Sequence, residues 1–132
     1  MANAEQSNHA KAFLTKAEDY LASAEDNLAA KRYTPAAGDA IHAGINAKDA
    51  IVTSLTGSTS KGKDHATAAK ELRTALAKRD SAATAERALR ELIAKGDVEY
   101  GAALISAAKA EPLVRRARSL VELATEIVRL GR

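Results

Sequence analysis

Alanine is the sequence feature that most constrains the fold of this chain. It occupies 32 of the 132 positions, whereas glycine occupies seven and proline two. Alanine has the highest helix propensity of the twenty residues, and glycine and proline oppose a helix most strongly. The chain is therefore expected to be helical over almost its whole length. Its size predicts one domain, residues 1–132, with a single core.

The composition also excludes several classes of protein. The chain has no cysteine, which excludes a disulfide scaffold, a thiol enzyme and a cysteine-based zinc module. No apolar run approaches the roughly 18 residues that a membrane span needs. The first ten residues lack the layout of a signal peptide. We therefore expect a cytoplasmic protein with no membrane partner, no metal and no cofactor.

Two long amphipathic helices are predicted in the first half of the chain. The first runs from about residue 5 or 7 to residue 31, because its apolar residues recur at steps of three and four. The second begins at Thr34, a capping residue followed by Pro35, and ends at Gly57, which accepts a left-handed conformation. The apolar arc of the second helix is unusually wide. Gly44 lies within it and predicts a close helix–helix approach.

Three more helices are predicted in the second half of the chain. Each has a residue that can cap its first turn, in chain order Asp64, then Asp80 or Ser81, then Ser106. The fourth helix is expected to end at residues 95–96, and residues 97–105 to form a connector interrupted by Gly101. Pro112 is expected to bend the last helix. The inward-facing stripe of that helix is expected to comprise Ala110, Leu113, Ala117, Leu120, Ala124 and Ile127. With no segment of strand period, this pattern predicts an all-α, antiparallel up-and-down bundle of four to five helices.

A polar stripe on the second helix is the most informative local pattern. Asp39, His42, Asn46, Asp49 and Thr53 follow steps of three and four, which places them on one face. In a ligand site, Asp39 would orient His42, and Asn46 and Asp49 would add acceptors for a nucleotide or a divalent metal. The same stripe is also typical of a solvent-facing surface or a polar dimer seam. All of these interpretations stay open at the level of sequence.

Three segments resemble the HEPN family (higher eukaryotes and prokaryotes nucleotide-binding). Residues 32–57 have a Tyr-led helix start, small residues and a final glycine. Residues 63–73 place His65 near a helix start, where it would meet a phosphate. Residues 98–128 combine a Tyr-bearing connector with a long amphipathic helix. The resemblance implies a dimeric, HEPN-like bundle that binds nucleotides and is often encoded beside a minimal nucleotidyltransferase, in a toxin–antitoxin-like pair.

Ribonuclease activity is not expected, even though some members of that family are ribonucleases. Those members depend on an arginine followed by four to six residues and then a histidine. Here Arg32 lies ten residues before His42, no arginine precedes His9, and none lies within thirty residues before His65. The sequence therefore predicts a non-catalytic binding or interaction module.

A DNA-binding protein is the alternative from a different class. Residues 61–95 carry nine basic and five acidic side chains, and such a balance attracts phosphates. A short turn with Lys78 and Arg79 joins the third and fourth helices, and Arg87 and Arg90 lie on the fourth, as in a recognition helix. The alanines between them leave few side chains able to reach base edges.

A homodimer is also expected. Alanine seams give the chain a thin core, since each alanine buries little apolar area. The apolar arc of the second helix predicts residual surface that a two-fold interface would cover.

Overall fold

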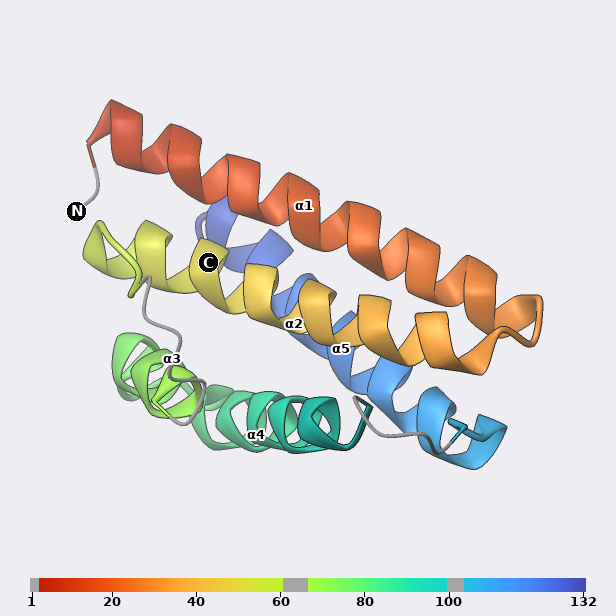
Figure 1. The fold of residues 1–132 in the computed structure, drawn as a ribbon. Coiled ribbons are helices and arrows are strands. Elements are labelled where there is room, and N and C mark those ends of the chain that lie inside the picture. Colours follow the sequence, from red (N-terminus) through yellow and green to blue (C-terminus); the bar gives the residue numbers. More distant parts are fainter. Residues whose placement is uncertain (1–2, 61–66, 100–103) are drawn as a thin grey trace.

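The structure, a computed structural model, describes residues 3–60, 67–99 and 104–132. It contains five helices: α1 (Ala4–Ala29), α2 (Tyr33–Thr56), α3 (Ala68–Leu76), α4 (Ala82–Glu99) and α5 (Ala107–Val128). The four long helices run alternately up and down, and the short α3 lies between α2 and α4 in the chain (Figure 1). The described residues form no strand. The predicted all-α, antiparallel up-and-down bundle is confirmed.

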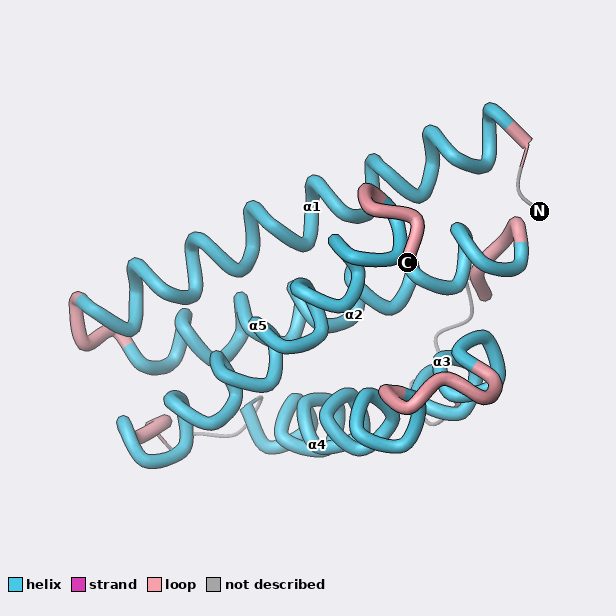
Figure 2. Tube along the Cα trace, turned by 180° about the vertical axis from the view of Figure 1, so that it is seen from behind, coloured by secondary structure: helices cyan, strands magenta, loops and turns pink. Residues whose placement is uncertain are grey.

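The helix α2 lies at the centre of the bundle. It contacts α1, α3, α4 and α5, and α5 also packs against α1 and α4 (Figure 2). Within the described residues, α1 contacts neither α3 nor α4. The wide apolar arc of α2 is thus covered by the chain itself, and it no longer argues for a second copy. None of the described helices combines the length and hydropathy that a membrane-spanning segment requires.

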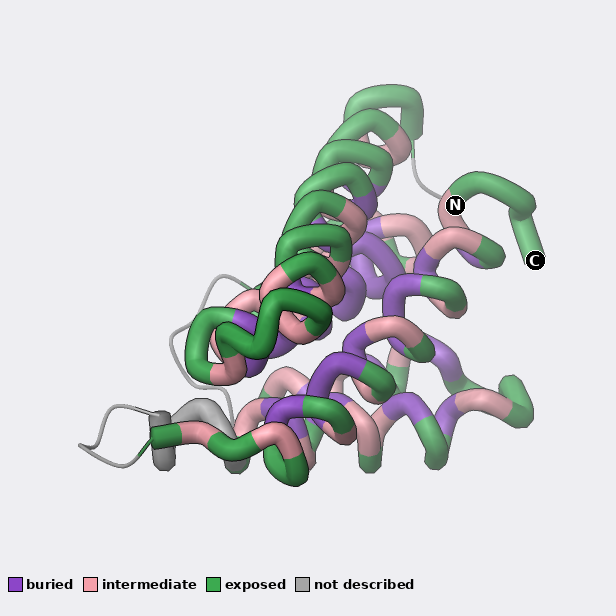
Figure 3. Tube along the Cα trace, turned by 90° about the vertical axis from the view of Figure 1, so that its right-hand side faces the viewer, coloured by how far each residue is buried: buried purple, intermediate pink, exposed green. Residues whose placement is uncertain are grey.

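The core is built largely from alanine and leucine. The buried side of each helix faces the centre of the molecule, and the exposed side faces outward (Figure 3). The stripe predicted for the last helix is buried at every position, and it comprises Ala110, Leu113, Ala117, Leu120, Ala124 and Ile127. Small side chains in these seams let the helix axes approach closely.

Gly44 marks one of these close approaches. A Cβ atom built at Gly44 would lie 2.6 Å from Cδ1 of Leu92 on α4 and 3.5 Å from Cδ1 of Leu120 on α5. The missing side chain therefore creates the space in which α4 and α5 meet α2. The close approach predicted from this glycine is confirmed.

The ends of α1 and α2 correct one prediction and confirm two. α2 begins at Tyr33 with Arg32 as its cap residue, so Thr34 lies inside the first turn and the prediction that it caps the helix was wrong. Pro35 occupies the first turn, where its missing N–H leaves no hydrogen bond unmade. Gly57 ends α2 with φ +95°, as predicted. α1 starts with an unpredicted capping box between Asn3 and Gln6.

The second half differs mainly around α4. The helix continues to Glu99, so the connector predicted for residues 97–105 was wrong for its first three residues. Gly96 does not end the helix, because glycine costs only about 1 kcal/mol relative to alanine inside a helix. Ser81 immediately precedes α4, and Ser106 caps α5 with an extended backbone but no side-chain hydrogen bond. Asp64 and His65 lie outside the described residues.

Candidate functional site

A seam between α1 and α2 contains four of the five stripe residues, Asp39, His42, Asn46 and Thr53. Two hollows open along this seam and share Lys16. The first, of about 490 Å³, is lined by Lys16, Asp19, Tyr20, Ser23, Asp39 and Asn46, and we call it the Tyr20 hollow. The second, of about 440 Å³, lies towards the end of α2 and includes the stripe residue Thr53, and we call it the Thr53 hollow.

Asp39 ties α2 to α1. Its Oδ2 accepts hydrogen bonds from Ser23 Oγ at 2.6 Å and from Asn27 Nδ2 at 3.0 Å. The Asn27 Oδ1 in turn accepts from Arg32 Nε at 2.8 Å, in the turn between the helices. In the ligand-site interpretation of the sequence, the Asp39 carboxylate orients the imidazole of His42. In the structure, its hydrogen bonds instead stabilise the α1–α2 pair.

His42 lies at the surface and stacks on an aromatic ring. Its imidazole and the phenol ring of Tyr20 have centroids 5.0 Å apart and planes inclined by 28°. Tyr20 is one of the few large apolar side chains exposed in the described residues, at 37%. Asn46 lines the same hollow and donates its Nδ2 to the backbone carbonyl of His42 at 2.9 Å. The structure thus brings Asp39, His42 and Asn46 to the same stretch of the seam.

Asp49 belongs to a separate buried network that sequence reasoning missed. Its Oδ1 accepts from Thr59 Oγ1 at 2.7 Å and from Lys48 Nζ at 3.1 Å. Lys48 is 3% exposed; its Nζ also donates to Thr59 Oγ1 at 2.9 Å and forms an ion pair with Glu71 on α3. Lys48 directly precedes the stripe residue Asp49, and nothing in the sequence predicts its burial, because its partner Glu71 on α3 is distant in sequence.

A metal site is not formed by these residues. Within the described ranges, no three His, Asp or Glu side chains are arranged to hold an ion. Asp39 Oδ2 and Asp49 Oδ1 already accept hydrogen bonds from hydroxyl, amide and ammonium groups. His65, the remaining predicted ligand residue, lies outside the described residues.

The four basic residues of the DNA-binding alternative have different neighbours. Arg90 pairs with Glu86 at 3.1 Å, and the Arg79 guanidinium donates to the carbonyl of Arg132 at the end of the chain. Arg87 lines a hollow of about 370 Å³ between α4 and α5. Lys78 lies exposed in the α3–α4 turn. The structure does not gather them into one set of unpaired cations.

Glu86 forms ion pairs with two arginines, Arg73 on α3 and Arg90 on α4. Its Oε1 accepts from Arg73 Nη1 at 2.8 Å, and its Oε2 contacts Arg90. The hydrogen bond from Arg73 lowers the pKa of Glu86 below its ordinary value of 4.5, partial burial opposes this, and Arg90 lowers it further. This cluster is a surface link between α3 and α4, and surface pairs add little to stability.

Comparison of the chain with protein-family models, with curated proteins and with solved structures gave no match.

Proposed function

We propose that this chain is a non-catalytic binding module of the HEPN type, which binds a nucleotide in the Tyr20 hollow. The three segments that resemble the family support the type, and the five-helix bundle agrees with it. Because a helical bundle serves many functions, the proposal depends on the chemistry of the site.

The observation that carries the proposal is the stacked pair of Tyr20 and His42 at the edge of the hollow. An exposed aromatic pair offers a π-face on which a nucleobase stacks, and such stacking contributes about 1–3 kcal/mol per base. Asn46 lines the same hollow with an amide, the group that pairs with the edges of bases. The base therefore lies on the ring of Tyr20, beside Asn46.

The charged side chains that line the Tyr20 hollow determine how a bound nucleotide is oriented. Asp19 and Asp39 lie in it and repel a phosphate, whereas Lys16 is the one cation among the described residues that line it. Lys16 precedes Tyr20 by four residues on α1, a distance of about 6 Å along the helix axis. A nucleotide stacked on Tyr20 thus places its phosphate at Lys16, where the two hollows meet.

A thermal-shift titration with AMP and ATP tests the site. Saturation at about 100 times the Kd adds roughly 2.7 kcal/mol to stability, which for this chain length raises the Tm by about 10 °C. Tyr20→Ala and His42→Ala should each reduce this shift strongly. His9→Ala, the control histidine on α1 outside the Tyr20 hollow, should leave it unchanged. No shift with either nucleotide refutes the proposal.

The non-catalytic part of the proposal rests on the missing Arg-to-His spacing. Incubation with RNA should give no cleavage above that of a buffer control. Cleavage that persists in His42→Ala and His65→Ala variants would overturn this interpretation of the residues.

The resemblance also supports two partners, a minimal nucleotidyltransferase in a toxin–antitoxin-like pair and a second copy of this chain. The first is tested by the neighbouring open reading frame, which should encode a small nucleotidyltransferase. For the second, Leu104 and Leu130 are large apolar side chains left exposed in the described residues. Light scattering at micromolar concentration should give twice the mass of 13.8 kDa, and the monomer mass refutes the dimer.

A further inference from the structure

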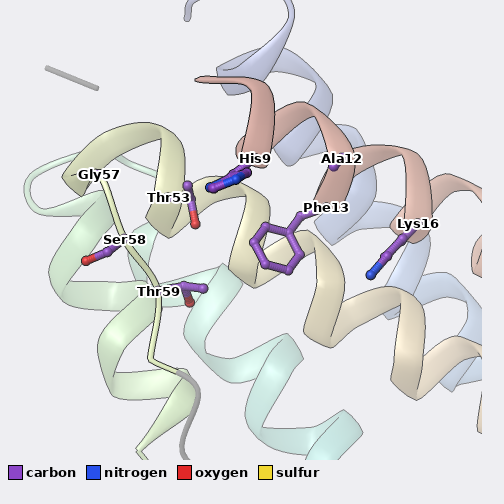
Figure 4. Close-up of a pocket in the computed structure, with 8 residues that line it drawn as sticks. All are labelled: His9, Ala12, Phe13, Lys16, Thr53, Gly57, Ser58 and Thr59. Carbon is purple, nitrogen blue, oxygen red and sulfur yellow. The ribbon is translucent and has the colours of Figure 1, made fainter. Parts of the chain in front are cut away.

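The Thr53 hollow lies between α1, α2 and the segment that follows α2 (Figure 4). Its polar and aromatic lining comprises His9, Phe13, Lys16, Thr53, Ser58 and Thr59. A volume of about 440 Å³ falls within the usual range of small-molecule pockets. The nucleotide proposed above does not contact Thr53, and Lys16 is the described residue that lines both hollows.

Thr53 is the residue that points to a ligand. In the described helices, Thr15, Thr56, Thr74 and Thr125 each donate to the carbonyl four residues earlier. The Thr53 hydroxyl makes no hydrogen bond within the described part of the chain, although the residue is only 3% exposed. Buried hydroxyls almost always have a partner. Figure 4 shows the Thr53 oxygen pointing into the hollow, between His9 and Thr59.

The wall opposite α1 is fixed in place. Thr59 donates to Asp49 at 2.7 Å and accepts from Lys48 at 2.9 Å. The Ser60 N–H donates to Glu71 on α3 at 3.3 Å. These contacts hold the segment after Gly57 against α2 and α3, so the hollow is formed before any ligand enters. Pre-formed walls reduce the entropy that a ligand must lose on binding.

The charges and the aromatic ring define the ligand. Among the described residues that line the hollow, Lys16 is the one permanently charged side chain, and none carries a carboxylate. The carboxylate of Asp49 accepts a hydrogen bond from the lining residue Thr59, and it is paired with Lys48. The ring of Phe13 lies between the Thr53 hydroxyl and the Lys16 ammonium (Figure 4). This order matches an aromatic acid with a polar group at the opposite end of its ring.

We propose that the Thr53 hollow binds a small aromatic acid. Its ring packs on Phe13, its carboxylate pairs with the Lys16 ammonium, and its hydroxyl bonds to Thr53 Oγ1. His9 closes the hollow at the start of α1. The site lies on the same seam as the Tyr20 hollow, and the two ligands share Lys16.

Titration of the ¹⁵N-labelled protein with 4-hydroxyphenylacetate tests this proposal by NMR. We expect saturable shifts at the amides of Ser58 and Thr59. Thr53→Val should weaken binding about fivefold, the effect of one hydrogen bond. Thr53→Ser keeps the hydroxyl and should bind the acid as tightly as the parent protein does. Thr125→Val is the matched control in another helix, and it should leave the affinity for the acid unchanged.

Further measurements test the parts of the proposal separately. The neutral analogue 4-hydroxyphenethyl alcohol should bind more weakly than the acid to the parent protein, and Lys16→Gln should abolish that difference. Thr53→Val should not lower the Tm, because the hydroxyl has no hydrogen-bond partner among the described residues; an unchanged Tm shows that the variant folds. His42→Ala should leave the aromatic acid's affinity unchanged, which distinguishes this site from the nucleotide site. No saturable shift, or equal affinity in Thr53→Val, overturns the proposal.

Discussion

Replacement of the buried lysine Lys48 by methionine should be strongly destabilising. Methionine has a similar length but no charge, so it leaves Asp49 and Glu71 without the ammonium that pairs with both. The side chain of Lys48 is 4% exposed, and those of Asp49 and Glu71 are 18% and 29% exposed. Removing one partner of a fully buried ion pair costs about 3–5 kcal/mol. Because the side chains of Asp49 and Glu71 are both partly exposed, we expect a smaller loss of about 2–3 kcal/mol.

Thermal denaturation measures this loss. An unfolding entropy of about 2.1 cal/mol/K per residue gives roughly 0.28 kcal/mol/K for a chain of this length, so the Tm should fall by about 7–11 °C. The double variant Lys48→Met with Glu71→Gln should recover part of the loss, since the uncompensated charge on α3 is gone. The control Lys70→Met, at an exposed lysine on α3, should shift the Tm little. A loss in Lys48→Met no larger than in this control, or strict additivity in the double variant, refutes the reasoning.

Three other predictions follow from single positions. Gly44→Val should destabilise by at least about 2 kcal/mol, because its side chain meets Leu92 and Leu120; an unchanged Tm contradicts this. Ala77 has φ +53° and ψ −113° in a tight turn closed by Arg79 N–H to Leu76 carbonyl at 3.1 Å, so Ala77→Gly should stabilise by about 1 kcal/mol, whereas the control Ala75→Gly inside α3 should destabilise. The lowered pKa of Glu86 means that its ion pairs stabilise the fold above the unfolded-state pKa and are lost as pH falls through the folded one. Glu86→Gln should therefore flatten the acid limb of stability against pH, and Glu126→Gln should not.

The helical fold follows from local chemistry, which is why sequence alone predicted it. Apolar steps of three and four placed the buried stripe of α5 correctly at every position, and Gly57 and Gly44 marked a helix end and a helix crossing. Thr34 failed as a cap because Arg32 already occupies the cap position. Gly96 failed as a helix end because its propensity penalty is small compared with the packing of α4.

The candidate site was predictable only in part. The spacing of Asp39, His42 and Asn46 correctly placed them on one face, but their partners Ser23, Asn27 and Tyr20 lie on another helix. No periodicity in α2 says which residues of α1 stand opposite. The burial of Lys48 and the unpartnered hydroxyl of Thr53 depend in the same way on contacts between distant segments.

The position of α5 has a consequence for how the chain folds while it is being synthesised. The pair of α1 and α2 is complete once residue 57 has been synthesised, whereas α5 follows the other four helices and packs against α1, α2 and α4. The pair of hydrogen bonds from Arg129 to Glu18, both 2.6 Å, spans 111 residues of sequence. The face of α2 around Gly44 therefore stays partly uncovered on the ribosome until α5 has been synthesised, because Leu120 of α5 covers it together with Leu92 of α4. Its small side chains limit the apolar surface that the nascent chain presents to its neighbours during that interval.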